Sequence, residues 1–267
     1  MRSRRDSAHK NGSAWRVNVA RWRLVGPIAV WVVACAQVVF EAFGGSETSP
    51  AASVDKPTTI CVSHILVHYW GARGATVVRT TETAMGIARE ALAKVLEPGA
   101  DFDSVGREFP RTYPDVVFER TGPFGRGKMA KSFDDTAFAL RPGQIADWIT
   151  STPFGFHVIR RNPTVRCRQI LIAYDGASRA IVTRTREEAL HLAEKVRAEA
   201  LQPASDFAAL ARRYSDSPDR LWGGDVGVFD RGRMVGPFEK AAFALKVGEI
   251  SPAIESRFGF HIIQRIE

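Results

Sequence analysis

The sequence predicts an α+β chain in which two similar domains follow one another, each a small antiparallel sheet of about four strands flanked by helices. Three observations indicate this fold class. A phrase of unusual composition occurs twice, apolar residues follow a helical period in both halves, and β-branched runs flank those helices. An apolar segment predicts one further helix ahead of the domains. At 267 residues, the chain has room for two domains of about 100 residues each.

The positive charge of the chain is concentrated at its N-terminus. Residues 1–23 contain seven Lys or Arg and one acid, so the net charge of +8 leaves 30 basic and 28 acidic residues in 24–267. A folded part that is nearly neutral argues against nucleic acid as a partner, although the overall charge alone would suggest it. We therefore expect no nucleic-acid binding.

The basic segment runs directly into an apolar one, residues 24–43, whose first 17 residues carry no charge. This order is typical of a secretory signal or a membrane anchor, and the basic head would stay in the cytoplasm. Small residues before Cys35 resemble a lipobox, which makes Cys35 a lipidation candidate. We expect an extracytoplasmic protein of the periplasm or cell envelope. It is anchored by residues 24–43, attached as a lipoprotein or released after signal cleavage, and these alternatives stay open. Residues 44–57 read as a linker rich in small residues.

The rest of the chain is a tandem duplication. FGFHVI at 154–159 and FGFHII at 258–263 belong to a longer repeat that aligns residues 58–162 with 163–267 at a spacing of 105, reduced to 104 near the end. Two further phrases, G-x-F-x-R-G-x-M and A-F-A-L, recur in the same order and register. The sequence therefore predicts one domain at 58–162 and a second at 163–267.

Each half contains the same series of expected elements. Apolar residues at i, i+3, i+4 and i+7 from Ala84, and again from Ala189, predict a long helix in each half. The second of these begins with the capping box of Thr185 and Glu188. The other expected elements are short helices that begin near Asp101 and Asp206, helices over 132–140 and 237–245, first strands over 61–68 and 167–172, and last strands over 155–160 and 259–265.

Both halves resemble the parvulin-type peptidyl-prolyl cis/trans isomerases, also called the PpiC or rotamase group. The phrases that carry the resemblance are SHILV at 63–67, YSDSPD and GGDVGVF within 214–229, RGRMVGPFEKAAFAL at 231–245, VGEIS at 247–251 and FGFHII. The resemblance implies an isomerase that acts on X-Pro bonds of exported proteins during folding. It also implies that the partners are unfolded or nascent polypeptides containing proline, and that no cofactor or metal is needed.

The chemistry of that reaction explains the residue types. Rotation about a prolyl bond is slow because it breaks amide resonance, with a barrier of ~18–20 kcal/mol. The enzyme needs an apolar slot for the ring and a site that favours the twisted amide. Period-two alternation puts His64 and His157 on one side of the sheet if their strands are neighbours.

The resemblance supplies the candidate site residues. The candidate catalytic residues are Gln169, Asp216, Ser217, His261, His64 and His157. The candidate substrate-binding residues are Met234, Phe238, Phe258, Met129, Phe133 and Phe154. In the family, the Met and Phe positions line the proline pocket, and the histidine pair forms a hydrogen-bonded network beneath the cleft.

Each half departs from the family pattern in its own way. The first half lacks the YSDSPD and GGD phrases, and Thr112 stands where the family carries Cys or Asp. The second half keeps those phrases with Ser217 at that position, but Gln169 replaces the histidine of the first strand. Glutamine still donates and accepts hydrogen bonds, so we expect the network to persist in altered form. The loss of the acidic loop reshapes the cleft wall of the first half, and we therefore expect the second half to be the more active one. The departures leave an alternative open, a non-catalytic extracytoplasmic chaperone that binds extended polypeptide segments through degenerate domains.

Two other classes of site are disfavoured. The spacing of His64, His68 and His157 is not that of a zinc site, and Ser217 is not part of a G-x-S-x-G nucleophile elbow. The remaining cysteines, Cys61 and Cys167, are expected to be unpaired strand residues.

Overall fold

The computed structural model describes residues 15–16 and 59–267. The basic segment apart from residues 15–16, the predicted apolar helix with Cys35 and the predicted linker lie outside the described residues. No helix within the described part of the chain is both long and apolar enough to cross a membrane.

The first half is built on a five-stranded antiparallel sheet of order β1-β6-β7-β3-β4, with β2 and β5 paired separately. The strands are β1 Trp15–Arg16, β2 Thr59–Ile60, β3 Val62–Val67, β4 Val116–Arg120, β5 Phe124–Gly125, β6 Trp148–Thr152 and β7 Gly155–Arg161. The helices are α1 Thr81–Val95, α2 Phe102–Thr112 and α3 Lys131–Ala139.

The second half repeats this plan with a four-stranded antiparallel sheet of order β10-β11-β8-β9. The strands are β8 Thr164–Ile172, β9 Asp225–Asp230, β10 Ile254–Ser256 and β11 Gly259–Arg265. The helices are α4 Arg186–Ala200, α5 Phe207–Tyr214 and α6 Gly236–Ala244, with a 3₁₀ turn η1 at Pro218–Trp222. The predicted antiparallel sheets, the three helix pairs and the first and last strands of each half are confirmed.

The helix boundaries follow the local signals in the sequence. Thr185 and Glu188 form both hydrogen bonds of the capping box at α4. Asp101 and Asp206 are the N-caps of α2 and α5, and each carboxylate accepts a backbone N–H of the first helical turn.

Each sheet has one face toward the long helices and one toward a shorter helix. In the first half, Ile65 of β3 and Phe156 of β7 pack with α1 and α2, whereas Val62 and Ile159 pack with α3 on the opposite face. The second half divides its apolar residues between α4 with α5 and α6 in the same way. Because side chains alternate along a strand, His64 and His157 lie on the α3 side of the first sheet, with Val62 and Ile159. His261 lies on the α6 side of the second sheet, with Ile263.

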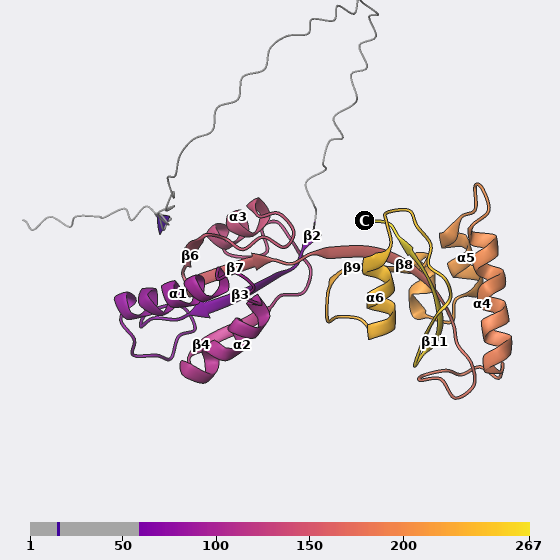
Figure 1. Cartoon of the computed structure of the whole chain (residues 1–267), viewed down its shortest axis with the longest axis horizontal. Coiled ribbons are helices and arrows are strands. Elements are labelled where there is room, and N and C mark those ends of the chain that lie inside the picture. Colours follow the sequence, from indigo (N-terminus) through magenta and orange to yellow (C-terminus); the bar gives the residue numbers. More distant parts are fainter. Residues whose placement is uncertain (1–14, 17–58) are drawn as a thin grey trace, which may run out of the picture.

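The two halves lie side by side and β8 leads from one into the other (Figure 1). They meet at Asp230, which is fully buried. Its carboxylate accepts hydrogen bonds from Arg120 at 2.9 Å, Asn162 at 2.6 Å and Arg233 at 3.2 Å. Arg233 also donates to the carbonyl oxygen of Thr121 at 2.7 Å, so both halves contribute to one polar junction.

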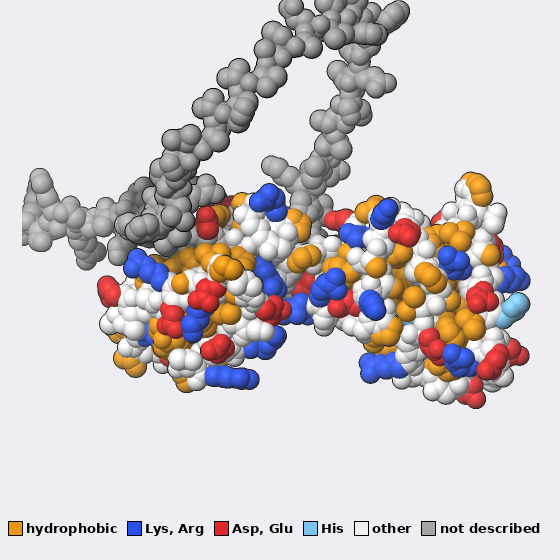
Figure 2. Space-filling model, viewed as in Figure 1, with side chains coloured by type: hydrophobic (Ala, Val, Ile, Leu, Met, Phe, Trp, Pro, Cys, Tyr) orange, Lys and Arg blue, Asp and Glu red, His pale blue; other side chains and the backbone are white. Residues whose placement is uncertain are grey.

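The surface in view carries both signs of charge. Acidic and basic side chains are interspersed over both halves, with hydrophobic side chains between them (Figure 2). Cys61 and Cys167 are buried and free, as expected, and burial raises the pKa of each thiol to about 11. Cys167 lies in β8 as predicted, whereas Cys61 lies between β2 and β3 and not in a strand.

Candidate active sites

A chain of hydrogen-bonding side chains crosses the α3 side of the first sheet. Antiparallel pairing sets Leu66 opposite His157 and thereby brings His64 next to it. His157 Nδ1 lies 3.3 Å from His64 Nδ1, and its Nε2 lies 2.8 Å from Thr152 Oγ1. At the other end, Nε2 of His64 lies 3.6 Å from a carboxylate oxygen of Glu119 on β4. We call Thr152, His157, His64 and Glu119 the first-half network.

The carboxylate at one end gives this network a direction. A carboxylate accepts only, so the nearby Glu119 favours the His64 tautomer with the hydrogen on Nε2, which leaves Nδ1 of His64 as an acceptor. His157 then donates from Nδ1, and its Nε2 accepts the hydroxyl of Thr152. Burial, with smaller effects of His64 and His68, lowers the pKa of His157 to about 3, which keeps its ring neutral at ordinary pH.

An apolar cavity of about 200 Å³ opens above the first-half network. The ring of Phe133 stands edge-on to the imidazoles of both His64 and His157, with centroids 5.2 Å apart in each case. Met129 and Phe154 complete the apolar wall, each 36% exposed. All five residues predicted for the first half therefore line one cavity.

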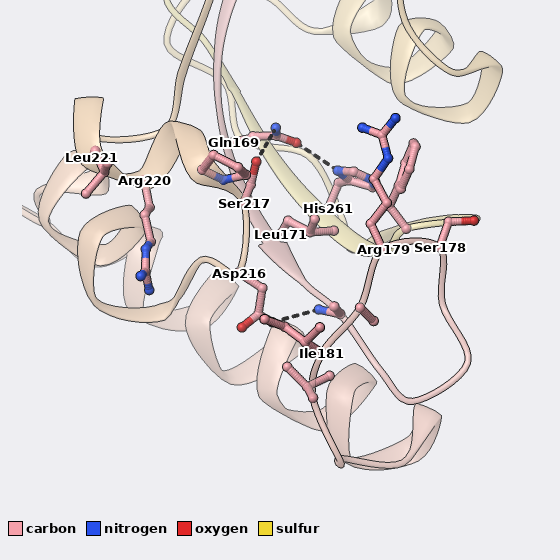
Figure 3. Close-up of a pocket in the computed structure, with 15 residues that line it drawn as sticks. Gln169, Leu171, Ser178, Arg179, Ile181, Asp216, Ser217, Arg220, Leu221 and His261 are labelled. Atoms are coloured by element: carbon pink, nitrogen blue, oxygen red, sulfur yellow. Dashed lines mark hydrogen bonds between the residues drawn. The ribbon is translucent and has the colours of Figure 1, made fainter.

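The second half contains an equivalent network with different members. His261 Nε2 lies 2.6 Å from Ser256 Oγ, and its Nδ1 lies 2.9 Å from Oε1 of Gln169 (Figure 3). The amide nitrogen of Gln169 donates to the carboxylate of Asp219 and, at 3.4 Å, to Ser217 Oγ. We call Ser256, His261, Gln169, Ser217 and Asp219 the second-half network. Burial lowers the pKa of His261 to about 4.

The second cavity is larger, about 800 Å³, and its wall is different. Gln169, Ser217 and His261 form one side and Phe258 another, with the guanidinium of Arg179 6.0 Å from the Phe258 ring centre. Asp216 also reaches the cavity wall (Figure 3).

Three predicted residues of the second half are not placed as expected. Phe238 and Met234 do not line the cavity, and Asp216 lines it but is not part of the second-half network. Phe238 is buried behind the cavity with its ring 5.4 Å from that of His261. Met234 packs on the apolar cluster of β8, β9 and α6 and does not line the cavity. Asp216 accepts hydrogen bonds from the backbone of Ala173 at 2.9 Å and from Arg184, and it has no hydrogen bond to Gln169 or His261.

Four residues of the two networks were not predicted. Thr152 and Ser256 occupy equivalent positions 104 residues apart, both with a hydroxyl and both five residues before the histidine. That repeated hydroxyl was a usable signal. Glu119 and Asp219 were harder to find, because they come from different elements and occupy different positions of the repeat.

The fold and the two networks define a tandem pair of small α+β domains, each with a cavity over a hydrogen-bonded network that contains a buried histidine. Comparison with known proteins assigns the family. Residues 51–164 and again residues 160–267 match the PPIC-type PPIASE domain. The chain belongs to this parvulin family and carries two copies of its domain, as the sequence predicted.

Individual relatives are similar to one copy or to both. The chain is 33% identical to the chaperone SurA of Nitrosospira multiformis over 221 residues, which cover 77% of this chain and 47% of the relative. It is 40% identical to the peptidyl-prolyl cis-trans isomerase Pin1 of Digitalis lanata over 111 residues, 38% of this chain and 94% of that protein. A solved structure of the isomerase ESS1 from Candida albicans is 35% identical over 39% of this chain and 63% of its own, with a TM-score of 0.38. The chain spans 36 to 47% of the length of the SurA relatives that it matches.

Proposed function

We propose that the chain is a peptidyl-prolyl cis/trans isomerase that acts on X-Pro bonds of exported polypeptides during their folding. The observation that carries this proposal is the pairing, in each half, of a cavity with a buried histidine whose ring is held neutral. Membership of the parvulin family and the similarity to Pin1 isomerases support it.

The arrangement suits a reaction in which no bond is made or broken. The twisted amide is less charge-separated than the planar one, so a site that excludes water favours the transition state over the ground state. The neutral rings of His157 and His261 provide such a floor without the desolvation cost of a buried charge. In the first half, Met129 and Phe133 would hold the proline ring while the peptide bond rotates beside His157.

Both halves are candidates for activity. The first cavity gathers all five residues predicted for it, so we propose that it binds and isomerises proline despite the loss of the YSDSPD phrase. In the second half, we propose that Phe258 is the apolar wall that contacts the proline ring, that Phe238 packs against His261 behind the cavity, and that the second-half network provides the floor. A cavity of about 800 Å³ is large enough for a short X-Pro segment of a polypeptide.

The cellular location and the substrates that we propose rest on the relatives and on the N-terminal sequence. Several relatives are named chaperone SurA, which supports unfolded polypeptides as substrates and an extracytoplasmic location. The basic segment and residues 24–43 would direct the domains across the membrane, and either those residues or a lipid on Cys35 would keep them at its surface.

A second candidate function has its own observation. Exposed apolar side chains border the second cavity: Ile181 is 100% exposed and Leu221 71% exposed, and the adjacent Trp222 is 67% exposed. Such a rim suits a chaperone that holds extended apolar segments without turnover. The two functions differ in whether binding of an X-Pro peptide is accompanied by faster isomerisation.

A prolyl isomerisation assay on the fragment 56–267 tests the proposal. Each half is also assayed alone, and Met129→Ala and Phe258→Ala are the variants that open the two cavities. Acceleration that falls in one variant assigns the activity to that half. Correctly folded fragments that bind unfolded clients but leave the isomerisation rate unchanged would replace the enzyme with the chaperone.

A further inference from the structure

The direction of the second-half network depends on its last member. Ser217 is itself a donor to Asp219, at 2.8 Å, so the carboxylate of Asp219 accepts from both Ser217 and the amide of Gln169. Either end of a glutamine amide can face a neighbour, and only its NH₂ end can face a carboxylate. The carbonyl end must then face His261, and Nδ1 of His261 must carry the hydrogen that this carbonyl oxygen accepts.

The local backbone is built to bring Asp219 to this place. The amide of Gly224 donates to the carbonyl of Asp219 at 3.0 Å, and its own carbonyl accepts the amide of Gln169 at 2.8 Å. Gly224 has φ +77°, and a Cβ there would lie 2.1 Å from the carbonyl oxygen of Gln169. A glycine is therefore required where the η1 turn closes against β8. The turn sets the Asp219 carboxylate beside the Gln169 side chain.

The first half reaches the same arrangement by another route. There β4 continues without such a turn, and Glu119 lies directly opposite His64 in the sheet register. Its carboxylate faces Nε2 of His64 at 3.6 Å. Each network therefore ends on a carboxylate, although neither the element nor the position in the repeat is shared.

We propose that Asp219 is a positioning residue of the second site: it fixes the orientation of the Gln169 amide and, through it, holds His261 in the tautomer with the hydrogen on Nδ1. This inference rests on the proposed isomerase function for its kinetic consequence only. With that tautomer, Nε2 of His261 accepts from Ser256, and the hydroxyl oxygen of Ser256 accepts the backbone N–H of Phe258 at 3.1 Å.

The glutamine at position 169, where the first half has His64, explains why Asp219 is needed. A neutral histidine at position 169 would offer one acceptor and one donor nitrogen, as His64 does in the first half. Glutamine offers the same pair, but its amide can turn over and exchange them. A fixed anion on the donor side removes that freedom, because the reversed amide would set its carbonyl oxygen against the carboxylate.

The test reads the tautomer of His261 directly in the full chain, by long-range ¹H–¹⁵N correlation spectra at pH 7 assigned with His261→Asn. We expect Nδ1–H in the unaltered protein, a mixture of both tautomers in Asp219→Asn, and Nδ1–H in the charge-conserving Asp219→Glu. Glu194→Gln, which removes one exposed acid from α4, is the matched control and should leave the tautomer unchanged. In a Met129→Ala background, Asp219→Asn should lower kcat/KM about tenfold, the equivalent of one hydrogen bond to a charged group.

Either of two results overturns the inference. One is an Nε2–H tautomer of His261 in the unaltered protein, a result that does not depend on whether any variant folds. The other is an unchanged tautomer in folded Asp219→Asn. If the tautomer shifts as expected but no variant and no unaltered protein accelerates isomerisation, the positioning role of Asp219 stands and the proposed isomerase function fails.

Discussion

The Nδ1 atoms of His64 and His157 face each other at 3.3 Å, so one of these nitrogens must carry a hydrogen and the other must accept it. Both imidazoles are buried, at 6% and 4% exposure. A proton on the accepting nitrogen would set two donors against each other in a site with little water. Because His157 is held neutral by burial, the stability of the fold depends on pH.

The first prediction concerns the pH dependence of folding. The pKa of His157 is lowered to about 3 and that of His261 to about 4, whereas both rings regain an ordinary pKa near 6.5 on unfolding. Between these values the unfolded state binds more protons, so stability is complete above pH 6.5 and falls as the pH decreases. From pH 6 to pH 5 we expect the two rings together to remove about 2 kcal/mol from the free energy of unfolding, measured by urea denaturation.

His157→Asn is the matched variant for this prediction. It removes one of the two titrating rings, so the loss over the same interval should drop to about 1 kcal/mol. Carboxylates whose pKa is lowered, such as Glu119 and Asp225, contribute at lower pH and leave this interval largely free. An unfolding free energy that stays level from pH 6 to pH 5 would show that the rings are not held neutral.

The second prediction separates binding residues from core residues. Met129 is 36% exposed at the first cavity, so Met129→Ala should lower kcat/KM of that half about tenfold and cost less than about 1 kcal/mol of stability. Phe133 is 4% exposed and packs on both histidines, so Phe133→Ala should cost about 3–5 kcal/mol. Met234→Ala is the comparison, because Met234 lies in the apolar cluster and not in a cavity wall. Equal kinetic effects of Met129→Ala and Met234→Ala would contradict the difference between the two sites.

The third prediction concerns the carboxylate of the first-half network. Glu119→Gln keeps an acceptor for Nε2 of His64 and should change kcat/KM of the first half less than about threefold. Glu119→Lys offers a donor instead, which forces His64 to carry its hydrogen on Nδ1 and opposes it to the Nδ1–H of His157. We expect a loss of about tenfold or more in kcat/KM. Because the Glu119 side chain is 60% exposed, urea denaturation should show little change in stability for Glu119→Gln. Equal kinetics of the two variants would remove Glu119 from the site.

The fourth prediction concerns the junction between the halves. Asp230→Ala leaves Arg120 and Arg233 without their buried partner, and we expect a loss of about 3–5 kcal/mol with separate unfolding transitions for the two halves. Glu255→Ala, which removes the exposed ion pair with Arg186, is the control and should cost at most about 1 kcal/mol. A single transition at an unchanged urea midpoint in Asp230→Ala would show that this junction does not couple the halves.

The sequence predicted most of the fold because the repeat doubled every signal. The helix period from Ala84 recurs from Ala189, and each long helix forms where the pattern places it. The separate β2–β5 pair and the η1 turn were not predicted, since two-residue strands and single turns leave too few residues for a period to show.

Recurrence in both halves singled out His157 and His261, which share a position in the repeat. Thr152 and Ser256 also share a position, but that signal was not used, and Glu119 and Asp219 share none. Asp216 was proposed for the second site from its neighbours in the sequence, yet its carboxylate is directed to the Ala173 backbone and Arg184. The partner of Gln169 is instead Asp219, three residues later. Which carboxylate of a turn points inward depends on how the turn closes, and spacing along the chain does not encode that.

The central claim is that prolyl bonds rotate faster in these cavities. Exchange NMR of an X-Pro peptide measures this directly, because cis/trans exchange peaks of the free peptide are absent on the timescale of uncatalysed isomerisation. With a substoichiometric amount of the fragment 56–267, we expect exchange peaks to appear for the unaltered protein and to weaken in Met129→Ala and in Asp219→Asn. Line broadening that reports binding, with no exchange peaks between the cis and trans forms, would contradict the account.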